Sequence, residues 1–422
     1  MPKLSITPSK HIYDALIQDI DVNQAISDLI DNAIDNWKIE GHEGKLLIYI
    51  EMSHDVIKIK DASGGMDENT LPFILMPGGR REVSREGIKG VWGVGSKRAL
   101  FSLGKKITIS TRKQGGKGLV LKVDENWFKT DAGDDKWTID YEEDNSLEEG
   151  ITIIEITELK VSLYPQYISS VQKHIARTYH DEIKDDTVEI SFNGAVITIY
   201  PEIPWAKSEY APPARYVTHI PVSGNGRVLN FDMTAGVMIK PGEAYSYGID
   251  FIGNKRVILQ NNLDARMGFD TDRLGFPHPT INRFKAIARV NGDSRDIPWN
   301  SAKSDVNVNH PMYVPIVDLV VQVARQYTSF LRKNYEVTSK LFRDLAEQSD
   351  IEDIPFEYGK EFRKVVKDFK EEEKLAWIRF GVPQAAYTEL VQGFGLEKST
   401  REQVGLFIFD KVLKELRGIV ED

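Results

Sequence analysis

Cysteine is absent from this 422-residue sequence. Disulfide bonds, zinc sites with thiolate ligands and cysteine nucleophiles are therefore excluded. The sequence also lacks a run of the roughly 18–20 uncharged apolar residues that span a bilayer. Its first residues lack the apolar segment of a secretory signal peptide. We therefore expect a cytoplasmic protein that has no membrane partner.

An excess of positive charge is also missing, since the formal net charge is −10. This argues against a uniformly basic nucleic-acid binder, although a local basic groove would not show in the sum. Hydrophobic residues make up 41% and charged residues 28% of the chain, which is the balance of an ordinary globular protein. Because 422 residues are too many for one hydrophobic core, we expect two or three domains.

The pattern of apolar residues predicts an α/β (α+β) fold in three regions. Residues 1–165 mix helices and strands, residues 166–310 combine a helical segment with strand pairs, and residues 311–422 are helical with charged faces. In the first region, apolar residues spaced three or four apart predict a helix over 21–37. A Gly-rich stretch at 78–95 leads into a second, short helix.

The strands are predicted from alternating apolar residues and turn signals. They lie at 45–51, 55–61, 106–111, 118–124, 136–142, 150–157, 215–222, 226–240, 249–260 and 284–291. Asn193-Gly194 predicts a tight hairpin between two more strands, and 168–184 reads as a helix.

A first polar constellation lies on the predicted helix 21–37. Asp28, Asn32 and Asp35 are spaced i, i+4 and i+7, which places them within about 60° of each other, opposite the apolar stripe. A solvated polar face is the commoner use of this pattern. The same arrangement suits a pocket wall, where a carboxylate polarises a water and an amide oxygen binds Mg²⁺. The helix alone leaves both interpretations open.

A second motif, Asp61-Ala62-Ser63-Gly64-Gly65-Met66, directly follows a predicted strand. An acidic residue at a strand end, followed by glycines, leaves a carboxylate facing an open cleft lined by backbone. An ordinary Asx/Gly turn is the alternative.

A third motif, Gly90-Val91-Trp92-Gly93-Val94-Gly95-Ser96-Lys97, opens a predicted helix. Glycines at a helix N-terminus let backbone N–H groups approach an anion, but the G-x-x-x-x-G-K-[ST] pattern of a P-loop is absent. The preceding glycines, Gly78, Gly79 and Gly87, flank Arg80, Arg81, Arg85 and Lys89. We interpret this stretch as a mobile lid with positive charges near a phosphate, with a solvated loop as the alternative. Trp92 and Phe101 are expected to be packing residues.

The order and spacing of these three motifs resemble the GHKL ATPases, which include gyrase, heat-shock chaperones, histidine kinases and MutL. The resemblance implies a Bergerat-type α/β sandwich that binds ATP. By the same resemblance Asn32 would hold Mg²⁺ and Asp61 would accept the adenine amino group. Asp28 stands where ATP-splitting members carry the glutamate that activates water. The remaining nucleotide-binding residues implied are Asp35, Gly65, Met66, Gly90, Gly93, Val94, Gly95, Ser96, Lys97 and Thr152, the last lying one residue off the common register.

Residues 248–310 resemble the MORC- and MutL-like branch, whose second domain is a transducer of the ribosomal-S5 type. Gly248-Ile249-Asp250-Phe251 leads into an asparagine-arginine pair, Asn254 and Arg256. Farther on, 298–305 takes the place of an Asn-x-Lys loop that reaches the ATP γ-phosphate in MORC-like proteins, which assigns that role to Lys303. A surface lysine in a polar loop is the alternative.

The resemblance implies a slow, Mg²⁺-dependent ATPase that forms a homodimer when ATP is bound, with DNA or a partner protein as its client. Two other classes stay open. Aspartate in place of glutamate at Asp28 would suit a non-hydrolysing nucleotide sensor or scaffold. The net acidity would suit a chaperone-like ATPase that acts on proteins.

Overall fold

The chain forms two compact units, Met1–Phe369 and Lys370–Asp422. The computed structural model describes residues 9–18, 20–79, 81, 83–124, 126–127, 137–199, 202–224, 226–240, 246–335, 349–368 and 381–416. Arg80, one of the expected lid residues, lies outside these ranges. Among the described residues, no helix is long and apolar enough to cross a membrane.

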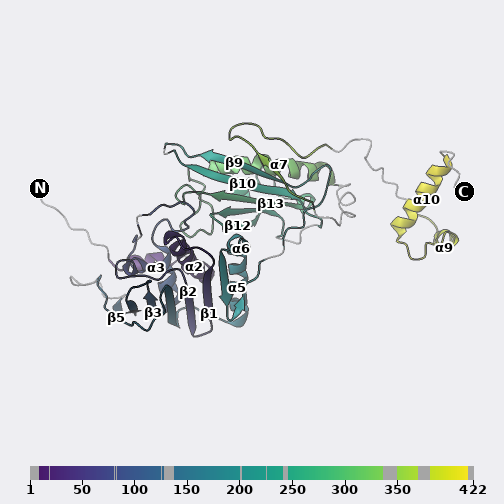
Figure 1. Cartoon of the computed structure of the whole chain (residues 1–422). Helices are drawn as coiled ribbons and strands as arrows, with labels where there is room; N and C mark the ends of the chain where they lie inside the picture. Colours follow the sequence, from purple (N-terminus) through teal and green to yellow (C-terminus); the bar gives the residue numbers. More distant parts are fainter. Residues whose placement is uncertain are drawn as a thin grey trace. The chain divides into compact units, whose positions relative to one another are not determined.

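An eight-stranded mixed sheet builds the first half of the larger unit (Figure 1). Its strands are β1 (Leu46–Met52), β2 (Val56–Asp61), β3 (Gly104–Arg112), β4 (Gly118–Val123), β5 (Tyr141–Glu143), β6 (Ile151–Leu159), β7 (Val188–Phe192) and β8 (Ala195–Val196), in the order β5-β4-β3-β6-β2-β1-β7-β8. The strands predicted at 45–51, 55–61, 106–111 and 118–124 appear as the antiparallel pairs β1/β2 and β3/β4. The Asn193-Gly194 hairpin is also confirmed, with both residues at positive φ.

Helices cover this sheet and make the first hydrophobic core with it. They are α1 (Ile12–Leu16), α2 (Val22–Ile39), α3 (Gly95–Leu103), α5 (Pro165–Thr178) and α6 (His180–Lys184). Helix α2 begins where Asp21 accepts a 2.8 Å hydrogen bond from the Gln24 amide, an ordinary N-cap. Its apolar residues Ile26 and Ile30 are buried against the sheet. The predicted helix at 21–37 is thereby confirmed.

The chain that builds the first sheet extends beyond residue 165. Strand β7 pairs in parallel with β1, with Ile190 opposite Ile48. A parallel pair needs a long crossover connection, and the chain between these strands includes every other strand of the sheet except β8. The predicted boundary at 165 therefore falls inside the segment that forms this sheet.

A six-stranded sheet forms the second half of the larger unit. Its order is β12-β11-β13-β10-β9-β14, from β9 (Ala214–Pro221), β10 (Val228–Val237), β11 (Gly248–Gly253), β12 (Arg256–Asn262), β13 (Phe284–Asn291) and β14 (Glu352–Pro355). Helix α7 (Tyr313–Lys333) packs on it through a second core. Strand β14 was not predicted, because residues 311–422 were expected to be helical. It pairs in parallel with β9.

The smaller unit contains helices α9 (Gln384–Gly393) and α10 (Arg401–Leu416) among its described residues. Phe394 and Phe407 join the two helices, with ring centroids 5.4 Å apart. Val404 is the buried residue of α10, whereas Leu406 and Phe409 are more than half exposed.

Candidate nucleotide site

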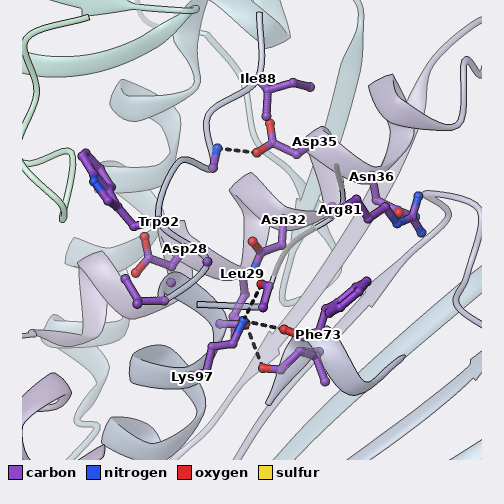
Figure 2. A pocket seen from close by; sticks show the side chains of 18 of the residues that line it. Asp28, Leu29, Asn32, Asp35, Asn36, Phe73, Arg81, Ile88, Trp92 and Lys97 are labelled. Carbon is purple, nitrogen blue, oxygen red and sulfur yellow. Dashed lines mark hydrogen bonds between the residues drawn. The ribbon is translucent and has the colours of Figure 1, made fainter. Parts of the chain in front are cut away.

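One cavity of about 200 Å³ brings the three sequence motifs together. Its wall combines α2, the end of β2, the glycine segment (residues 90–95) that leads into α3, and the loop that carries Lys303 (Figure 2). Of the predicted residues, the cavity is lined by Asp28, Asn32, Asp35, Asp61, Met66, Gly90, Gly93, Val94, Gly95, Ser96, Lys97, Thr152 and Lys303. The polar face of α2 therefore lines a pocket and is not simply solvated.

At one end of the cavity, Asp61 is buried at the close of β2. Its carboxylate accepts the Ser63 amide at 3.1 Å. Burial raises the pKa of Asp61 to about 6, because a desolvated carboxylate is costly to ionise. Thr152 lies directly opposite Asp61 in the β2/β6 register and shares a 2.9 Å hydrogen bond with the Thr111 hydroxyl. This end of the site offers one acidic acceptor beside strand hydroxyls.

Gly65 differs from its expected role beside a ligand. It does not line the cavity, and its φ is +69°. A Cβ atom built there would lie 2.1 Å from the Arg112 carbonyl oxygen. Gly65 is therefore required for close packing of the motif against β3. The neighbouring Met66 lines the cavity and donates its amide to Thr111 at 2.9 Å.

The glycine segment forms another part of the cavity wall. Gly93 has φ +64°, and a Cβ there would lie 2.6 Å from the Gly79 carbonyl oxygen. Helix α3 begins at Gly95, and Val94 supplies no side-chain cap, which leaves N-terminal amides without a side-chain acceptor. Ser96 donates its hydroxyl to the Ile74 carbonyl at 2.9 Å.

Lys97 extends its ammonium group to the carbonyl oxygens of Phe73 and Gly79 (Figure 2). The residue is buried, and burial lowers the pKa of Lys97 to about 7. A cation held by two neutral carbonyls is stabilised less than one that faces an anion. Lys97 is thus a buried cation on the cavity wall without an acidic partner among the described residues.

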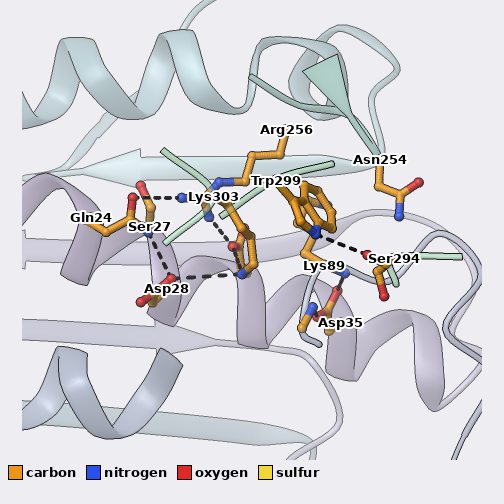
Figure 3. A network of polar contacts seen from close by, with 12 residues as sticks. Gln24, Ser27, Asp28, Asp35, Lys89, Asn254, Arg256, Ser294, Trp299 and Lys303 are labelled. Carbon is orange, nitrogen blue, oxygen red and sulfur yellow. Dashed lines mark hydrogen bonds and ion pairs between the residues drawn. The ribbon is translucent and has the colours of Figure 1, made fainter. Parts of the chain in front are cut away.

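Asp28 and Lys303, which also line the cavity, belong to a buried polar cluster (Figure 3). Asp28 accepts from Arg98 at 2.6 Å and from Gln24 at 3.0 Å. The Lys303 ammonium lies 2.7 Å from Asp31 and 3.9 Å from Asp28. Lys303 is 6% exposed, so it is not a surface lysine.

Asp31 is the centre of that cluster. It also accepts from the Tyr179 hydroxyl at 2.9 Å and pairs with Arg256 of β12. Burial by itself would raise the pKa of Asp31, but Arg256 and Lys303 lower it to about 2. One carboxylate of α2 therefore holds two cations from the second sheet and the loop that follows it.

Both carboxylate oxygens of Asp35 accept hydrogen bonds from backbone amides of the protein. It accepts the Lys89 amide at 2.8 Å and the Gly90 amide at 2.6 Å. Burial raises the pKa of Asp35. The side chain thus anchors the start of the glycine segment.

The positively charged residues of the expected lid lie in two different environments. Arg81 and Arg85 line the cavity, where Arg81 pairs with Glu40 at 2.5 Å and Arg85 donates to the Gly90 carbonyl at 3.1 Å. The expectation was wrong for Lys89, which is fully buried and pairs with Glu182 at 2.5 Å.

The two aromatic residues near the glycine segment also differ from each other. Trp92 was expected to pack, but it is 41% exposed and lines the cavity. Phe101 is buried as predicted, with its ring centroid 4.7 Å from that of Tyr13.

Comparison with known families agrees with this geometry. Residues 20–152 match the family model of the histidine kinase-, DNA gyrase B-, and HSP90-like ATPases. This segment is a GHKL-type ATPase domain. The match covers less than half of the chain and does not reach the second sheet. A search of the curated proteins found no match.

The GHKL-type domain has one side chain suited to Mg²⁺. Asn32 is exposed to the cavity, and its amide makes no hydrogen bond within the described part of the chain. No group of three or more histidine or acidic residues suited to a metal occurs there either. The Asn32 amide oxygen would therefore hold the ion together with phosphate oxygens and water, in keeping with the preference of Mg²⁺ for oxygen ligands and retained waters.

Asp31, Asn36 and Arg98 of the GHKL-type domain were not predicted from the sequence. Asn36 lines the cavity and donates to the Ser63 carbonyl at 2.8 Å. Arg98 could have been predicted as a site residue, because it directly follows Lys97 of the third motif. Asp31 could not have been predicted from the sequence, because its partner Arg256 lies 225 positions along the chain.

Proposed function

We propose that this protein binds MgATP in the cavity, hydrolyses it to ADP and phosphate, and uses bound ATP as a MORC- or MutL-like switch. The observation that carries the proposal is the shared cavity. It joins Asp61 and Thr152 at one end to Lys97, Asp28 and Lys303. The GHKL-type match over residues 20–152 supports the same ligand.

Asp61 accepts the adenine amino group in this proposal, with Thr152 beside it in the neighbouring strand. Asn32 holds Mg²⁺, which would neutralise negative charge on the phosphate oxygens. The amides at the start of α3 and the Lys97 ammonium bind the phosphates. An anion there gives Lys97 the counter-charge that the two carbonyls do not supply.

Hydrolysis requires a water to attack the γ-phosphorus as the bond to the β-phosphate oxygen breaks. Asp28 takes the proton from that water, and ADP leaves with the bridging oxygen. Lys303 stabilises the charge on the transferred phosphoryl group. To do so, its ammonium exchanges Asp31 for the phosphate, and Arg256 remains to compensate Asp31.

The switch follows from the position of Lys303 in the chain. It lies, with Ser301, after β13 of the second sheet, whereas the other residues that line the cavity belong to the first half of the unit. A γ-phosphate held by Lys303 ties the two halves together, orders the lid and favours a homodimer. The client is DNA or a protein, and salt-dependent retention on DNA would identify the former.

The first test is Asp61→Asn, with ATP affinity measured by calorimetry. Losing the charged acceptor in a buried site should weaken binding by about tenfold to a hundredfold. Asp55→Asn is the matched control, because Asp55 is an exposed aspartate in the β1–β2 turn. Unchanged affinity in Asp61→Asn would overturn the assignment of the pocket.

A non-hydrolysing sensor is the second candidate function. It is favoured by Asp28, whose two oxygens are already engaged by Arg98 and Gln24. Arg98 and Gln24 occupy part of the acceptor capacity of this carboxylate, so fewer of its lone pairs remain for a water. Release of γ-phosphate by the purified protein distinguishes an ATPase from a sensor.

A further inference from the structure

The lid stem, residues 85–90, is the last part of the expected lid and leads into the glycine segment. It is hydrogen-bonded to the chain that directly follows β13 of the second sheet. The Gly87 amide donates to the Gly292 carbonyl at 3.0 Å. The Ser294 amide donates to the Arg85 carbonyl at 3.1 Å, and Glu86 forms an antiparallel bridge with Asp293. The lid stem therefore runs beside the chain that leaves β13.

Asn254 reinforces this connection with its side chain. It lies in the β11–β12 turn, has φ +45° and is 2% exposed. Its amide nitrogen donates to the carbonyls of Ile88 at 2.9 Å and Gly292 at 3.0 Å. Its amide oxygen accepts the Gly292 amide at 3.0 Å. One buried amide thus joins the lid stem, the end of β13 and its own turn.

The opposite side of the lid stem is held by α2. Asp35 accepts the amides of Lys89 and Gly90, as described above. The next residue, Val91, packs in the hydrophobic core of the second sheet. The lid stem and Val91 therefore contact both halves of the larger unit.

The chain that touches the lid stem continues to Lys303. Trp299 lies between these points, is 1% exposed and donates its indole N–H to the Ser294 carbonyl at 3.1 Å (Figure 3). A displacement of the lid stem would therefore move the chain that runs from Ser294 to Lys303. This path through the backbone is separate from the ion pairs of Asp31.

We propose that Asn254 is a positioning residue that couples order in the lid to the second sheet and to Lys303. The inference rests on the proposed binding of ATP in the cavity. Because both amide hydrogens and the oxygen of Asn254 are used, the lid stem cannot shift relative to Gly292 without breaking buried hydrogen bonds. Closure of the lid over ATP therefore also orders the β11–β12 turn and the chain after β13.

The test is Asn254→Asp, studied by amide hydrogen exchange with ADP and with a non-hydrolysable ATP analogue. Aspartate keeps the acceptor for the Gly292 amide but loses both donors. In the unaltered protein, the analogue should slow exchange in the pocket (28–36) and in the second sheet (248–262 and 284–291). In Asn254→Asp the pocket should stay protected, while the second-sheet protection should fall about tenfold, as expected for a lost buried hydrogen bond. Turnover should fall with little change in KM.

Asn193→Asp is the matched control. Asn193 also has positive φ and pairs its amide with the backbone of Met52 in the first sheet, at 2.8 Å and 3.0 Å. Asn254→Gly relieves the positive φ and removes the amide, so it tests the same loss if the aspartate variant does not fold.

The outcomes separate the inference from the function on which it rests. Pocket protection with unchanged second-sheet protection in both Asn254 variants would overturn the coupling role alone. Equal effects in Asn193→Asp would also overturn it, because the response would then be general. No protection of the pocket in the unaltered protein would overturn the proposed function and the inference together.

Discussion

Two buried ionisable side chains that line the cavity have pKa values near neutrality. Burial raises the pKa of Asp61 to about 6 and lowers that of Lys97 to about 7. Both shifts favour the neutral form, as desolvation must. A bound ligand of suitable charge can therefore change the protonation state of each group.

The raised pKa of Asp61 predicts that base binding depends on pH. The carboxyl becomes protonated as the pH falls through about 6, so it loses the charge that attracts the adenine amino group. Adenosine affinity should fall about fivefold between pH 6 and pH 5. Adenosine is the appropriate ligand for calorimetry because it has no phosphate to titrate. A pH profile that is equally steep in Asp61→Asn would contradict this origin.

Asp28 is the residue on which hydrolysis depends. If it takes the proton from water, Asp28→Asn should lower turnover by about a hundredfold or more. The neutral amide still accepts a hydrogen bond from Arg98, so ATP affinity should change little. Asp28→Glu is the companion variant and should retain turnover. Equal turnover in Asp28→Asn and the unaltered protein would exclude Asp28 as the base.

At the scale of elements, the glycine segment is held in place by a buried ion pair. Lys89 and Glu182 of α6 are at most 1% exposed in their side chains. Burial by itself would raise the pKa of Glu182, but Lys89 and Lys38 lower it to about 2. The pair therefore stabilises the fold above pH 4.5 and progressively less as the pH falls from there to about 2.

Lys89→Met should destabilise the protein by about 3–5 kcal/mol, because it leaves a buried carboxylate with Lys38 as its remaining cationic partner. Denaturant unfolding measures this change. Lys122→Met is the control, since the Lys122–Glu142 pair is exposed and its loss should have no measurable effect. Equal unfolding midpoints for Lys89→Met and Lys122→Met would show that the buried pair contributes nothing.

Elements were predicted well where the signal was local. The helix at 21–37 appears as α2 (Val22–Ile39), and the Asn193-Gly194 hairpin appears between β7 and β8. Strand β14 was missed because it consists of only Glu352–Pro355 and its pairing with β9 links distant parts of the chain. Periodicity over four residues cannot distinguish a short edge strand from a loop.

At the scale of the whole molecule, Lys303 is the group that should report the γ-phosphate. In Lys303→Met, the non-hydrolysable ATP analogue should no longer shift the protein from monomer to dimer, as measured by light scattering. ADP affinity should remain, because ADP lacks the phosphate that Lys303 is proposed to contact. Lys333→Met is the control, since Lys333 is an exposed lysine near the end of α7. An unaltered dimer shift in Lys303→Met would remove Lys303 from the switch.

The sequence by itself determined the three motifs, their order and hence the ATP pocket as a hypothesis. Short-range spacing suffices for this, because each motif is local to a helix, a turn or a helix N-terminus. It also placed Lys303 near the pocket, but only through resemblance.

Only the tertiary structure decided which of these groups are engaged. Asp35 is bonded to the glycine segment, Lys89 is buried on Glu182, and Asp28 is held by Arg98. These contacts join residues that are 55 to 93 positions apart, and a polar residue on a helix face gives no sign of its distant partner. Burial then sets which charges are paired, because an unpaired charge inside the fold would be too costly.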